Sequence, residues 1–366
     1  MAIKKTGISR DLIIHPGETI GDILEARNMT QAELAVRTGV SPAFIGSVIA
    51  GRKDISSKFA IALEYALEVP KSFWLNLQAR YYAELLEYDE ENTISDEEII
   101  IRNDLNEIVS YLRKHNYIPA KGTINQSIIA LRRIFKVSSL CNLEKIPSAS
   151  AFRISSKDRI NPCILGAWIR MCQINECKFE EDKTFDPDKT DSLAAELKKL
   201  MSSNFEGTEL NQKIKKVFYN YGLDFEIVQH FRGAPVQGFL YKRADNRIKI
   251  CMTIRRAFAD IFWFSLFHEL GHIYNGDLSK SSKFLDDGND KIKEYAADKY
   301  ASDKLLDSKA YDGFISNYKN APSYELIRDF AFSQNVPPFI VIGRMQREHI
   351  IKYQEYAFAK TRYKWV

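Results

Sequence analysis

Hydrophobic residues recur every three or four positions along most of this chain, which predicts helices with one buried face. In Thr19–Arg27, for example, Ile20, Ile23 and Leu24 share one side of the helix. The pattern predicts helices at Thr19–Arg27, two short segments within Thr30–Lys53, Phe59–Leu67, Phe73–Tyr81, Glu97–Asn116, Ile124–Val137, Asn161–Ile174, Ser192–Met201, Leu210–Tyr221, Phe262–His272, Lys291–Ala301 and Ile327–Ile351, the last divided by Pro337-Pro338.

Between residues 225 and 253 the spacing of hydrophobic residues changes from that of helices to that of short strands. Phe225–Phe231, Val236–Lys242 and Arg247–Thr253 alternate or run apolar, with turns at Gly233 and Asp245-Asn246. This predicts a small antiparallel sheet, so the expected fold class is mainly α with a small β-sheet. An edge strand can hold an extended peptide by main-chain hydrogen bonds, and we expect the edge of this sheet to be functional.

Residues 29–53 have the signature of two short helices joined by a tight turn. Thr30 and Glu33 form a capping box, Gly39 supplies the turn, and Ser41 with Pro42 opens the second helix. This arrangement predicts an N-terminal, all-α helix-turn-helix domain, whose second helix enters the major groove of DNA.

The exposed face of the second helix offers small or apolar side chains rather than the Arg, Lys, Asn and Gln that usually contact bases. We expect it to suit a thymine methyl, a sugar or a protein surface, while flanking polar groups contact phosphates. The candidate DNA-binding residues are Gln31, Arg37, Ser41, Ala43, Phe44, Ser47, Arg52 and Lys53. Protein docking or dimerisation is the alternative use of the motif.

The stretch from His15 to Tyr82 resembles the HigA-type antitoxins of the Xre superfamily. The resemblance includes the leading His15-Pro16-Gly17-Glu18 and the closing Phe73-Trp74-Leu75-Asn76-Leu77. It implies a domain that forms a homodimer, binds operator DNA and binds a toxin partner.

Length and composition indicate a globular protein of two or three domains. The chain has 366 residues, 45% hydrophobic and 27% charged, with a formal net charge of +4. This small net charge neither requires nor excludes binding to nucleic acid. Five scattered cysteines fit a reduced cytoplasm, and without a leader or a membrane-length apolar run we expect a cytoplasmic protein with no membrane association.

An acidic stretch, Glu84–Glu98, is broken by Asn92-Thr93 and indicates a domain boundary, although a solvated helix face would have the same composition. The predicted division is a helix-turn-helix domain at residues 1–88, a helical connector at 89–150 and a third domain at 151–366.

The most specific chemical motif is His268-Glu269-Leu270-Gly271-His272. Residues four apart lie on one helix face, so His268 and His272 present two imidazoles to one metal ion. Glu269 is then placed to accept a proton from water, as in zinc hydrolases. A pair of solvated or structural histidines is the alternative, but the preceding run Phe262-Trp263-Phe264 predicts a buried helix, and Gly271 permits close packing.

Catalytic zinc usually has three protein ligands, and the helix at Lys291–Ala301 offers the third. Glu294 and Asp298 are four residues apart on it, with Ala297, Tyr300 and Ala301 as its inward side. We assign Glu294 as a ligand and Asp298 as the carboxylate that accepts the other ring N–H of a ligating histidine.

From about Ala151 onward the chain resembles the ImmA/IrrE metallopeptidase family. The matching stretches are Phe262–His272, Glu294–Ala301 and the tail Val336–Gln346; members usually carry a second glutamate where this chain has Ala296. The resemblance implies an α+β zincin-like domain of the gluzincin type with one zinc ion, held by His268, His272 and Glu294. It also implies Glu269 as general base and the cleavage of repressor proteins.

Two functions follow from these patterns. The first is a transcriptional regulator in which a DNA-binding domain is joined to a zinc-dependent endopeptidase that cleaves a repressor or partner protein. The alternative is an antitoxin-like autorepressor whose zinc domain senses or docks without proteolysis.

Overall fold

The computed structural model describes residues 10–147, 152–154, 160–180, 183–202, 207–255, 257–278, 290–318 and 322–363. The chain divides into two compact units, one formed by Met1–Asn103 with Leu112–Leu131 and the other by Asp104–Tyr111 with Arg132–Val366. The fold is mainly helical with one small sheet, as predicted. No described helix combines the length and apolarity needed to cross a bilayer.

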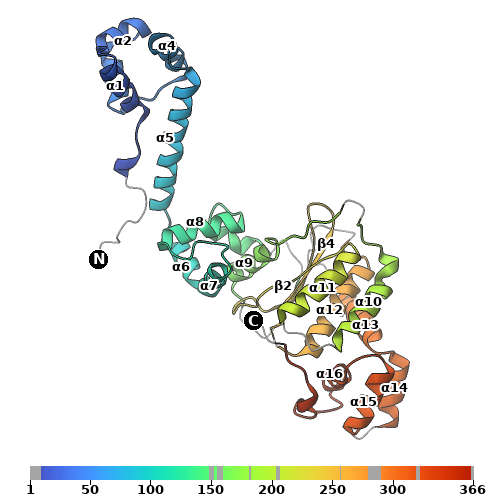
Figure 1. The fold of residues 1–366 in the computed structure, drawn as a ribbon. Helices are drawn as coiled ribbons and strands as arrows, with labels where there is room; N and C mark the ends of the chain where they lie inside the picture. The colour runs from blue at the N-terminus through green and yellow to red at the C-terminus, as the bar shows by residue number, and fades with distance from the viewer. Residues whose placement is uncertain are drawn as a thin grey trace. The chain divides into compact units, whose positions relative to one another are not determined.

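Five helices make up most of the first unit: α1 (Pro16–Ala26), α2 (Gln31–Thr38), α3 (Pro42–Ile49), α4 (Ser57–Leu67) and α5 (Lys71–Asn92) (Figure 1). The Thr30 hydroxyl accepts a hydrogen bond from the Glu33 amide at 3.1 Å, and the Ser41 hydroxyl accepts one from the Phe44 amide at 3.2 Å. Gly39 turns the chain between α2 and α3 with φ +67°. The predicted helix-turn-helix is therefore confirmed in its caps and its turn.

The start of α1 depends on a close contact with α3. The Nδ1 atom of His15 accepts a hydrogen bond from the Gly17 amide at 3.0 Å and caps the helix. A Cβ on Gly17 would lie 1.9 Å from the carbonyl oxygen of Val48, so only glycine lets the two helices approach this closely. Leu34, Val48 and Trp74 are fully buried in the core that these helices share.

The following helices differ from the predicted ones. Helix α5 continues to Asn92, past residue 88, and the predicted division into three domains stays a prediction. The single helix predicted at Glu97–Asn116 is two helices, α6 (Asp96–Asp104) and α7 (Asn106–Lys114). Asn and Asp side chains compete for backbone hydrogen bonds, which explains a break within Asn103–Asn106. Helix α8 (Ile124–Phe135) follows as predicted.

The second unit contains a four-stranded sheet in the order β1-β3-β4-β2. Its strands are β1 (Phe152–Ile154), β2 (Asp224–Ile227), β3 (Val236–Lys242) and β4 (Ile248–Met252). Strands β3 and β4 are antiparallel neighbours, whereas β2 runs parallel to β4, and β1 was not predicted. The prediction of a purely antiparallel sheet is wrong because alternation along a strand identifies its faces but not its neighbours.

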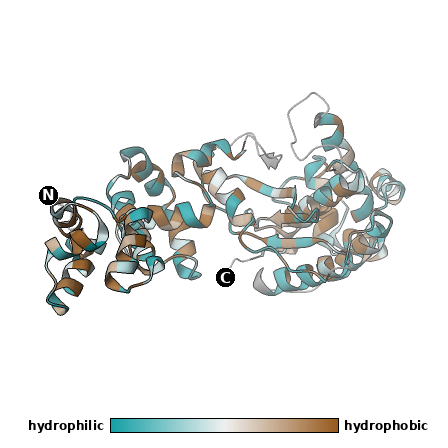
Figure 2. Ribbon diagram, turned by 90° about the horizontal axis from the view of Figure 1, so that it is seen from above, coloured by the Kyte–Doolittle hydropathy of each residue, from teal (hydrophilic) through white to brown (hydrophobic). Residues whose placement is uncertain are grey.

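One continuous apolar core is formed by this sheet and the helices α10 (Thr190–Met201), α11 (Gly207–Asn220), α12 (Ala259–Tyr274), α13 (Asp290–Leu305), α14 (Ser308–Asn317), α15 (Tyr324–Ser333) and α16 (Pro338–Arg347). Helix α9 (Pro162–Cys172) is not part of that core and contacts the sheet through Trp168, whose ring centre lies 6.0 Å from that of Phe239. Figure 1 shows α10 to α13 beside the sheet and α14, α15 and α16 grouped together below them. In Figure 2 the apolar residues gather in the strands and helices at the centre of this unit.

Helix α12 is deeply buried in the core, with Trp263, Leu266 and Phe267 fully inaccessible. The C-terminal segment fixes its first turn: the Ala259 amide donates to the Thr361 carbonyl at 3.0 Å, and the Trp263 indole donates to the Tyr363 hydroxyl at 2.8 Å. The helix is therefore held from its first turn by a segment about a hundred residues later in the sequence.

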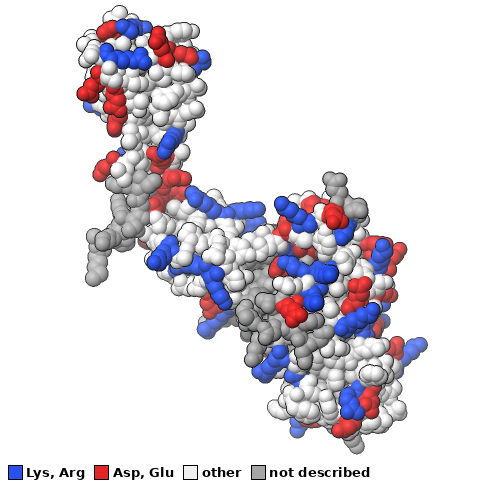
Figure 3. Space-filling view, in the orientation of Figure 1, with Lys and Arg blue, Asp and Glu red and all other residues white. Residues whose placement is uncertain are grey.

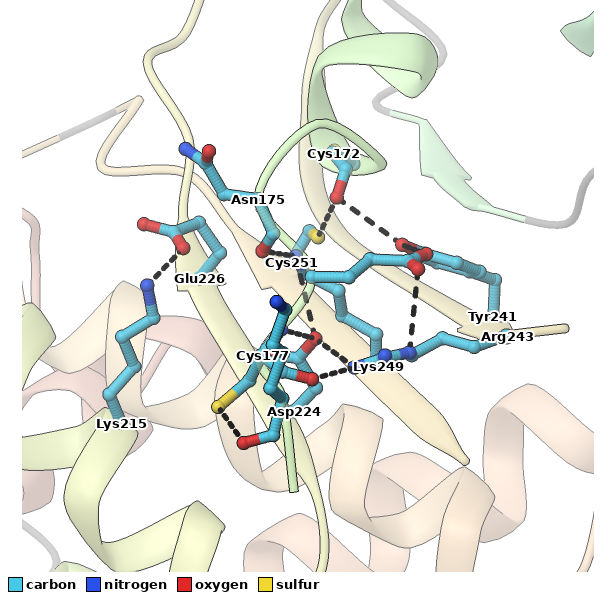
Figure 4. A network of polar contacts seen from close by, with 12 residues as sticks. Cys172, Asn175, Cys177, Lys215, Asp224, Glu226, Tyr241, Arg243, Lys249 and Cys251 are labelled. Atoms are coloured by element: carbon cyan, nitrogen blue, oxygen red, sulfur yellow. Dashed lines mark hydrogen bonds and ion pairs between the residues drawn. The ribbon is translucent and has the colours of Figure 1, made fainter. Parts of the chain in front are cut away.

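A polar network centred on Asp224 joins β2, β3 and β4 to the segment after α9 (Figure 4). Asp224 is 1% exposed, and its Oδ2 atom accepts from the Arg243 Nη1 atom at 2.8 Å and from the Cys177 amide at 3.0 Å. The fully buried ammonium of Lys249 lies 3.6 Å from the same oxygen. The buried carboxylate of Asp224 is thus shared by two cations, of which Lys249 is fully buried and Arg243 also pairs with Asp245 and Glu176.

We expect Asp224→Ala to destabilise the second unit by about 3–5 kcal/mol, because the fully buried ammonium of Lys249 loses its paired carboxylate, whereas Arg243 keeps the more exposed Asp245 and Glu176. The matched control is Asp245→Ala, which removes another carboxylate 3.1 Å from Arg243 that is 43% exposed, and should cost less than about 1 kcal/mol. Hydrogen exchange of the amides in β2 to β4 measures the difference. Equal losses of protection in the two variants would contradict a special role for the buried carboxylate.

Candidate functional site

The close packing of α12 on α13 sets the position of every side chain in the candidate metal site. A Cβ on Gly271 would lie 2.9 Å from the Cα atom of Ala297, so the two backbones nearly touch at this point. Ala297 and Ala301 are fully buried and Tyr300 is 7% exposed, which confirms the predicted inward side of α13. Because Glu294 precedes Ala297 by nearly one helical turn, its carboxylate reaches the histidines of α12.

Three side chains predicted as metal ligands converge. The two oxygens of Glu294 lie 3.3 Å from the Nε2 atoms of His268 and His272, and these two nitrogens are 3.0 Å apart. Zinc–ligand bonds of about 2.0–2.1 Å at tetrahedral angles place ligand atoms about 3.3 Å apart, so this donor set fits a zinc ion. The group is a possible metal site, since one ligand atom from each residue lies within 4.8 Å of the others.

Each imidazole is oriented by a carboxylate on its other nitrogen. The Nδ1 atom of His268 lies 2.8 Å from the Oδ1 atom of Asp298, the contact predicted from the helical spacing, and the Nδ1 atom of His272 lies 2.8 Å from the Oδ2 atom of Asp277. When Nδ1 carries the proton and donates to a carboxylate, Nε2 keeps its lone pair for a metal.

Asp277 was not predicted, although the sequence contains a signal for its position. Helix α12 ends at Tyr274, and Gly276 adopts φ +70°, which turns the chain back so that the Asp277 amide donates to the His272 carbonyl at 3.0 Å. A glycine just beyond a helix, followed by an acid, predicts such a return. Asp277 therefore reaches the histidine that it orients through the geometry of the helix end.

The charges of the site are tightly coupled. Burial lowers the pKa of His272, but the carboxylates of Glu294, Glu269 and Asp277 outweigh it and raise this pKa to about 9. Hydrogen bonds from His268 and His272 hold the pKa of the Glu294 carboxyl well below its usual range. In the absence of metal His272 is therefore protonated at neutral pH, and a metal ion has to displace that proton.

Glu269 lies beside the candidate ligands and is packed against β3. It is 5% exposed, and a Cβ on Gly238 would lie 2.2 Å from its Oε1 atom. Gly238 lies within β3 and leaves space for this carboxylate. A second link between the two elements is the hydrogen bond from the Ser265 hydroxyl to the Gln237 Oε1 atom at 3.3 Å.

On the helix-turn-helix, most of the predicted DNA-binding residues are exposed, but several have neighbours within the domain. Arg37 pairs with Glu33 at 2.5 Å, the Ser47 hydroxyl donates to the Ala43 carbonyl at 2.7 Å, and the half-buried ring of Phe44 packs edge-on against Phe59 at 5.1 Å. The exposed residues are Gln31, Arg37, Ser41, Ala43, Arg52 and Lys53. Contact of all eight residues with DNA stays a prediction.

The electrostatic contribution of this surface is modest. Residues 20–74 contain six Lys and Arg and six Asp and Glu, so the segment has no net charge. Figure 3 shows acidic and basic side chains interspersed over the part that contains α1 to α4. Attraction to phosphates therefore has to come from local groups such as Arg52 and Lys53, which follow α3 directly.

Comparison with solved structures finds several similar chains, of which the following three are each matched over a small part of this one. An antidote protein of a plasmid maintenance system from Nostoc punctiforme is 40% identical, with 22% of this chain and 89% of that chain covered and a TM-score of 0.20. The antitoxin GraA is 28% identical, with 21% and 84% covered and a TM-score of 0.21. The antitoxin HigA of Pseudomonas aeruginosa, solved with the higBA promoter, is 27% identical, with 23% and 96% covered and a TM-score of 0.21.

Comparison with curated proteins finds no match. A sequence model of the family described as helix-turn-helix matches residues 20–74, which contain α2, α3 and α4. The zincin-like character predicted for the C-terminal part rests on residues outside this match and stays a prediction. Residues 20–74 are a helix-turn-helix domain.

Proposed function

We propose that the protein is a DNA-binding transcriptional regulator whose second unit contains a zinc centre. Operator DNA is bound by the helix-turn-helix domain, with α3 at the major groove and Arg52 and Lys53 at phosphates. The match of residues 20–74 to the helix-turn-helix family supports DNA binding. A homodimer would present two such helices to a two-fold operator.

The zinc centre is proposed from one observation, the convergence of two imidazole nitrogens and one carboxylate within 4.8 Å. His268, His272 and Glu294 would hold one zinc ion, and Asp298 and Asp277 would keep both imidazoles in the metal-binding tautomer. Three protein ligands are the usual number in catalytic sites, whereas structural zinc sites usually have four.

Hydrolysis of a peptide bond in a repressor or other partner protein is the chemistry that these side chains favour. Zinc supplies Lewis acidity, which lowers the pKa of water and polarises a carbonyl group. The carboxylate of Glu269 would accept the proton and pass it to the leaving amine. The support for this role is its position next to His268 and its contact with β3 at Gly238.

The second candidate is an antitoxin-like autorepressor with a toxin partner, in which the zinc centre senses or docks without proteolysis. It is favoured by the family match, which lies entirely within the DNA-binding part of the chain. Both candidates share DNA binding and zinc binding, and they differ in the partner protein and in the role of Glu269.

Purified protein is expected to contain about one zinc ion per chain. Alanine in place of His268, His272 or Glu294 should abolish retention of zinc through dialysis, and Asp298→Asn should weaken zinc affinity about 10–100-fold. His349→Ala, an exposed histidine of the same unit, is the control and should retain zinc. Elemental analysis by mass spectrometry gives the stoichiometry, and equal zinc in the Glu294 and His349 variants would exclude Glu294 as a ligand.

Glu269→Gln separates the two candidates. If the centre is hydrolytic, the variant should keep its zinc but lose at least about 100-fold in the cleavage rate of a mixed peptide library, since it cannot accept a proton. Product peptides are identified by mass spectrometry. Zinc-loaded wild type that cleaves no more than the variant would reject the peptidase and leave the autorepressor.

Binding to its own promoter DNA should weaken steeply as salt rises, because phosphate contacts release counterions. Replacing Arg52 and Lys53 with alanine should weaken binding and make the slope of log K against log salt shallower by about two. Lys71→Ala, an exposed lysine paired with Glu64 at 2.9 Å, is the control. Fluorescence anisotropy measures both quantities, and a flat salt response in the wild type would argue against DNA binding.

A further inference from the structure

The second unit contains a cavity of about 780 Å³ between α12, α13, α16 and the segment from Tyr353 to Arg362. This volume lies within the range of about 300–1,000 Å³ that is typical of small-molecule sites. The described residues that line the cavity all belong to the second unit. The three candidate zinc ligands are not among them, so the cavity is separate from the metal centre.

Apolar side chains from three helices form much of the wall. Helix α12 contributes Ile261 and Phe264, α13 contributes Leu305 and α16 contributes Ile340, while Phe258 lies just before α12. Ile261 and Phe264 are only half-buried, although most of α12 is buried, because they face this cavity. An apolar molecule in the cavity would remove these side chains from water, which is the main source of affinity for such a ligand.

Buried charges at the cavity are paired within the protein. The carboxylate of Asp260 lies 2.9 Å from the ammonium of Lys360, and both side chains are more than nine-tenths buried. The Nε atom of Arg344 lies 2.9 Å from the Oε1 atom of Glu348, and its guanidinium also covers the ring of Tyr311 at 3.9 Å. These three lining side chains already have their counter-charges, so a ligand does not need to supply one.

The other two lining cations, Arg347 and Arg362, are exposed, so water solvates their charges. Their guanidinium groups lie over the rings of Phe264 and Phe258, 3.9 and 4.4 Å from the ring centres. An ionic ligand would exchange its own hydration for contacts with charges that are already paired or solvated, which costs free energy. The cavity therefore favours an uncharged ligand.

One polar edge of the cavity is formed by Gln237 and Ser265. The Ser265 hydroxyl donates to the Gln237 Oε1 atom at 3.3 Å. Within the described part of the chain, the Nε2 atom of the same amide has no hydrogen-bond partner. This nitrogen can donate to a hydroxyl, carbonyl or ether oxygen of a ligand.

We infer that this cavity binds a small, uncharged, amphipathic molecule, with an apolar body and one hydrogen-bonding oxygen. The apolar body would cover Ile261, Phe264 and Leu305. The oxygen would accept a hydrogen bond from the amide nitrogen of Gln237. The site is distinct from the DNA-binding surface and from the zinc centre, and it goes beyond the functions proposed for both.

The polar edge of the cavity also connects it to the elements that hold Glu269. Ser265 is one helical turn before Glu269 on α12. Gln237 precedes Gly238, which contacts Glu269 from β3. A ligand bound at Gln237 would therefore touch both elements that position this carboxylate, which is what an effector of the second unit requires.

The binding test uses the full chain and N-phenyl-1-naphthylamine, an uncharged probe that fluoresces in apolar surroundings. Its fluorescence should rise to saturation at one molecule per chain. Ile261→Trp and Ala357→Trp, which fill the cavity from α12 and from its exposed rim, should each weaken binding about tenfold or more. Ile160→Trp, at an exposed isoleucine of the same unit, should bind as wild type does. Because Ala357 is exposed, its variant keeps the test valid if Ile261→Trp fails to fold.

Competition identifies the ligand class. Decanol should displace the probe, whereas decanoate and decyltrimethylammonium, which have the same chain length and opposite charges, should each displace it about tenfold less well. Gln237→Leu should weaken displacement by decanol about 2–10-fold, as expected for the loss of one neutral hydrogen bond.

Three results would overturn the proposal. They are equal probe affinity in the Ile261, Ala357 and Ile160 variants, displacement by either ion that equals displacement by decanol, and unchanged displacement by decanol in Gln237→Leu. Because the measurement does not need zinc, the site can fail this test while the zinc centre stands, and the reverse is equally possible.

Discussion

Two imidazole nitrogens 3.0 Å apart, both directed at one carboxylate, form the interaction on which the candidate metal centre depends. Two imidazoles with facing lone pairs repel each other at this distance, and a cation between them or a proton on one of the two Nε2 atoms relieves that repulsion. The raised pKa of His272 shows that the site favours a proton on this imidazole when no metal is bound. A divalent ion would also relieve the repulsion between the imidazoles. Its positive charge would be stabilised by the surrounding carboxylates of Glu269, Glu294, Asp277 and Asp298.

Two glycines make this arrangement sterically possible. Gly271 brings α13 close enough for Glu294 to reach the histidines, and Gly238 leaves space in β3 for Glu269. A methyl group at either position would meet the backbone of Ala297 or the carboxylate of Glu269 at well under contact distance. Gly271 and Gly238 therefore determine the geometry of the centre as much as the metal-ligating side chains do.

The helix caps, the turn and the candidate metal ligands could be predicted from short-range sequence patterns. The features that were not predicted depend on contacts between segments far apart in the sequence. The caps at Thr30 and Ser41 and the turn at Gly39 are short-range features, and the sequence identified them correctly. The convergence of Glu294 with His268 and His272 followed from helical spacing and a shared ion. In contrast, the parallel pairing of β2 with β4 depends on which strand it meets, and alternation along a strand does not show this.

The attachment of α12 to Thr361 and Tyr363 has a consequence for the order in which the chain acquires structure during synthesis. The core of α1 to α5 is built from neighbours within about sixty residues and can assemble while translation continues. The contacts of α12 with Thr361 and Tyr363 can form only after residue 363 has left the ribosome. The helix-turn-helix domain can thus be complete well before α12, which carries two of the candidate metal ligands, is held in place.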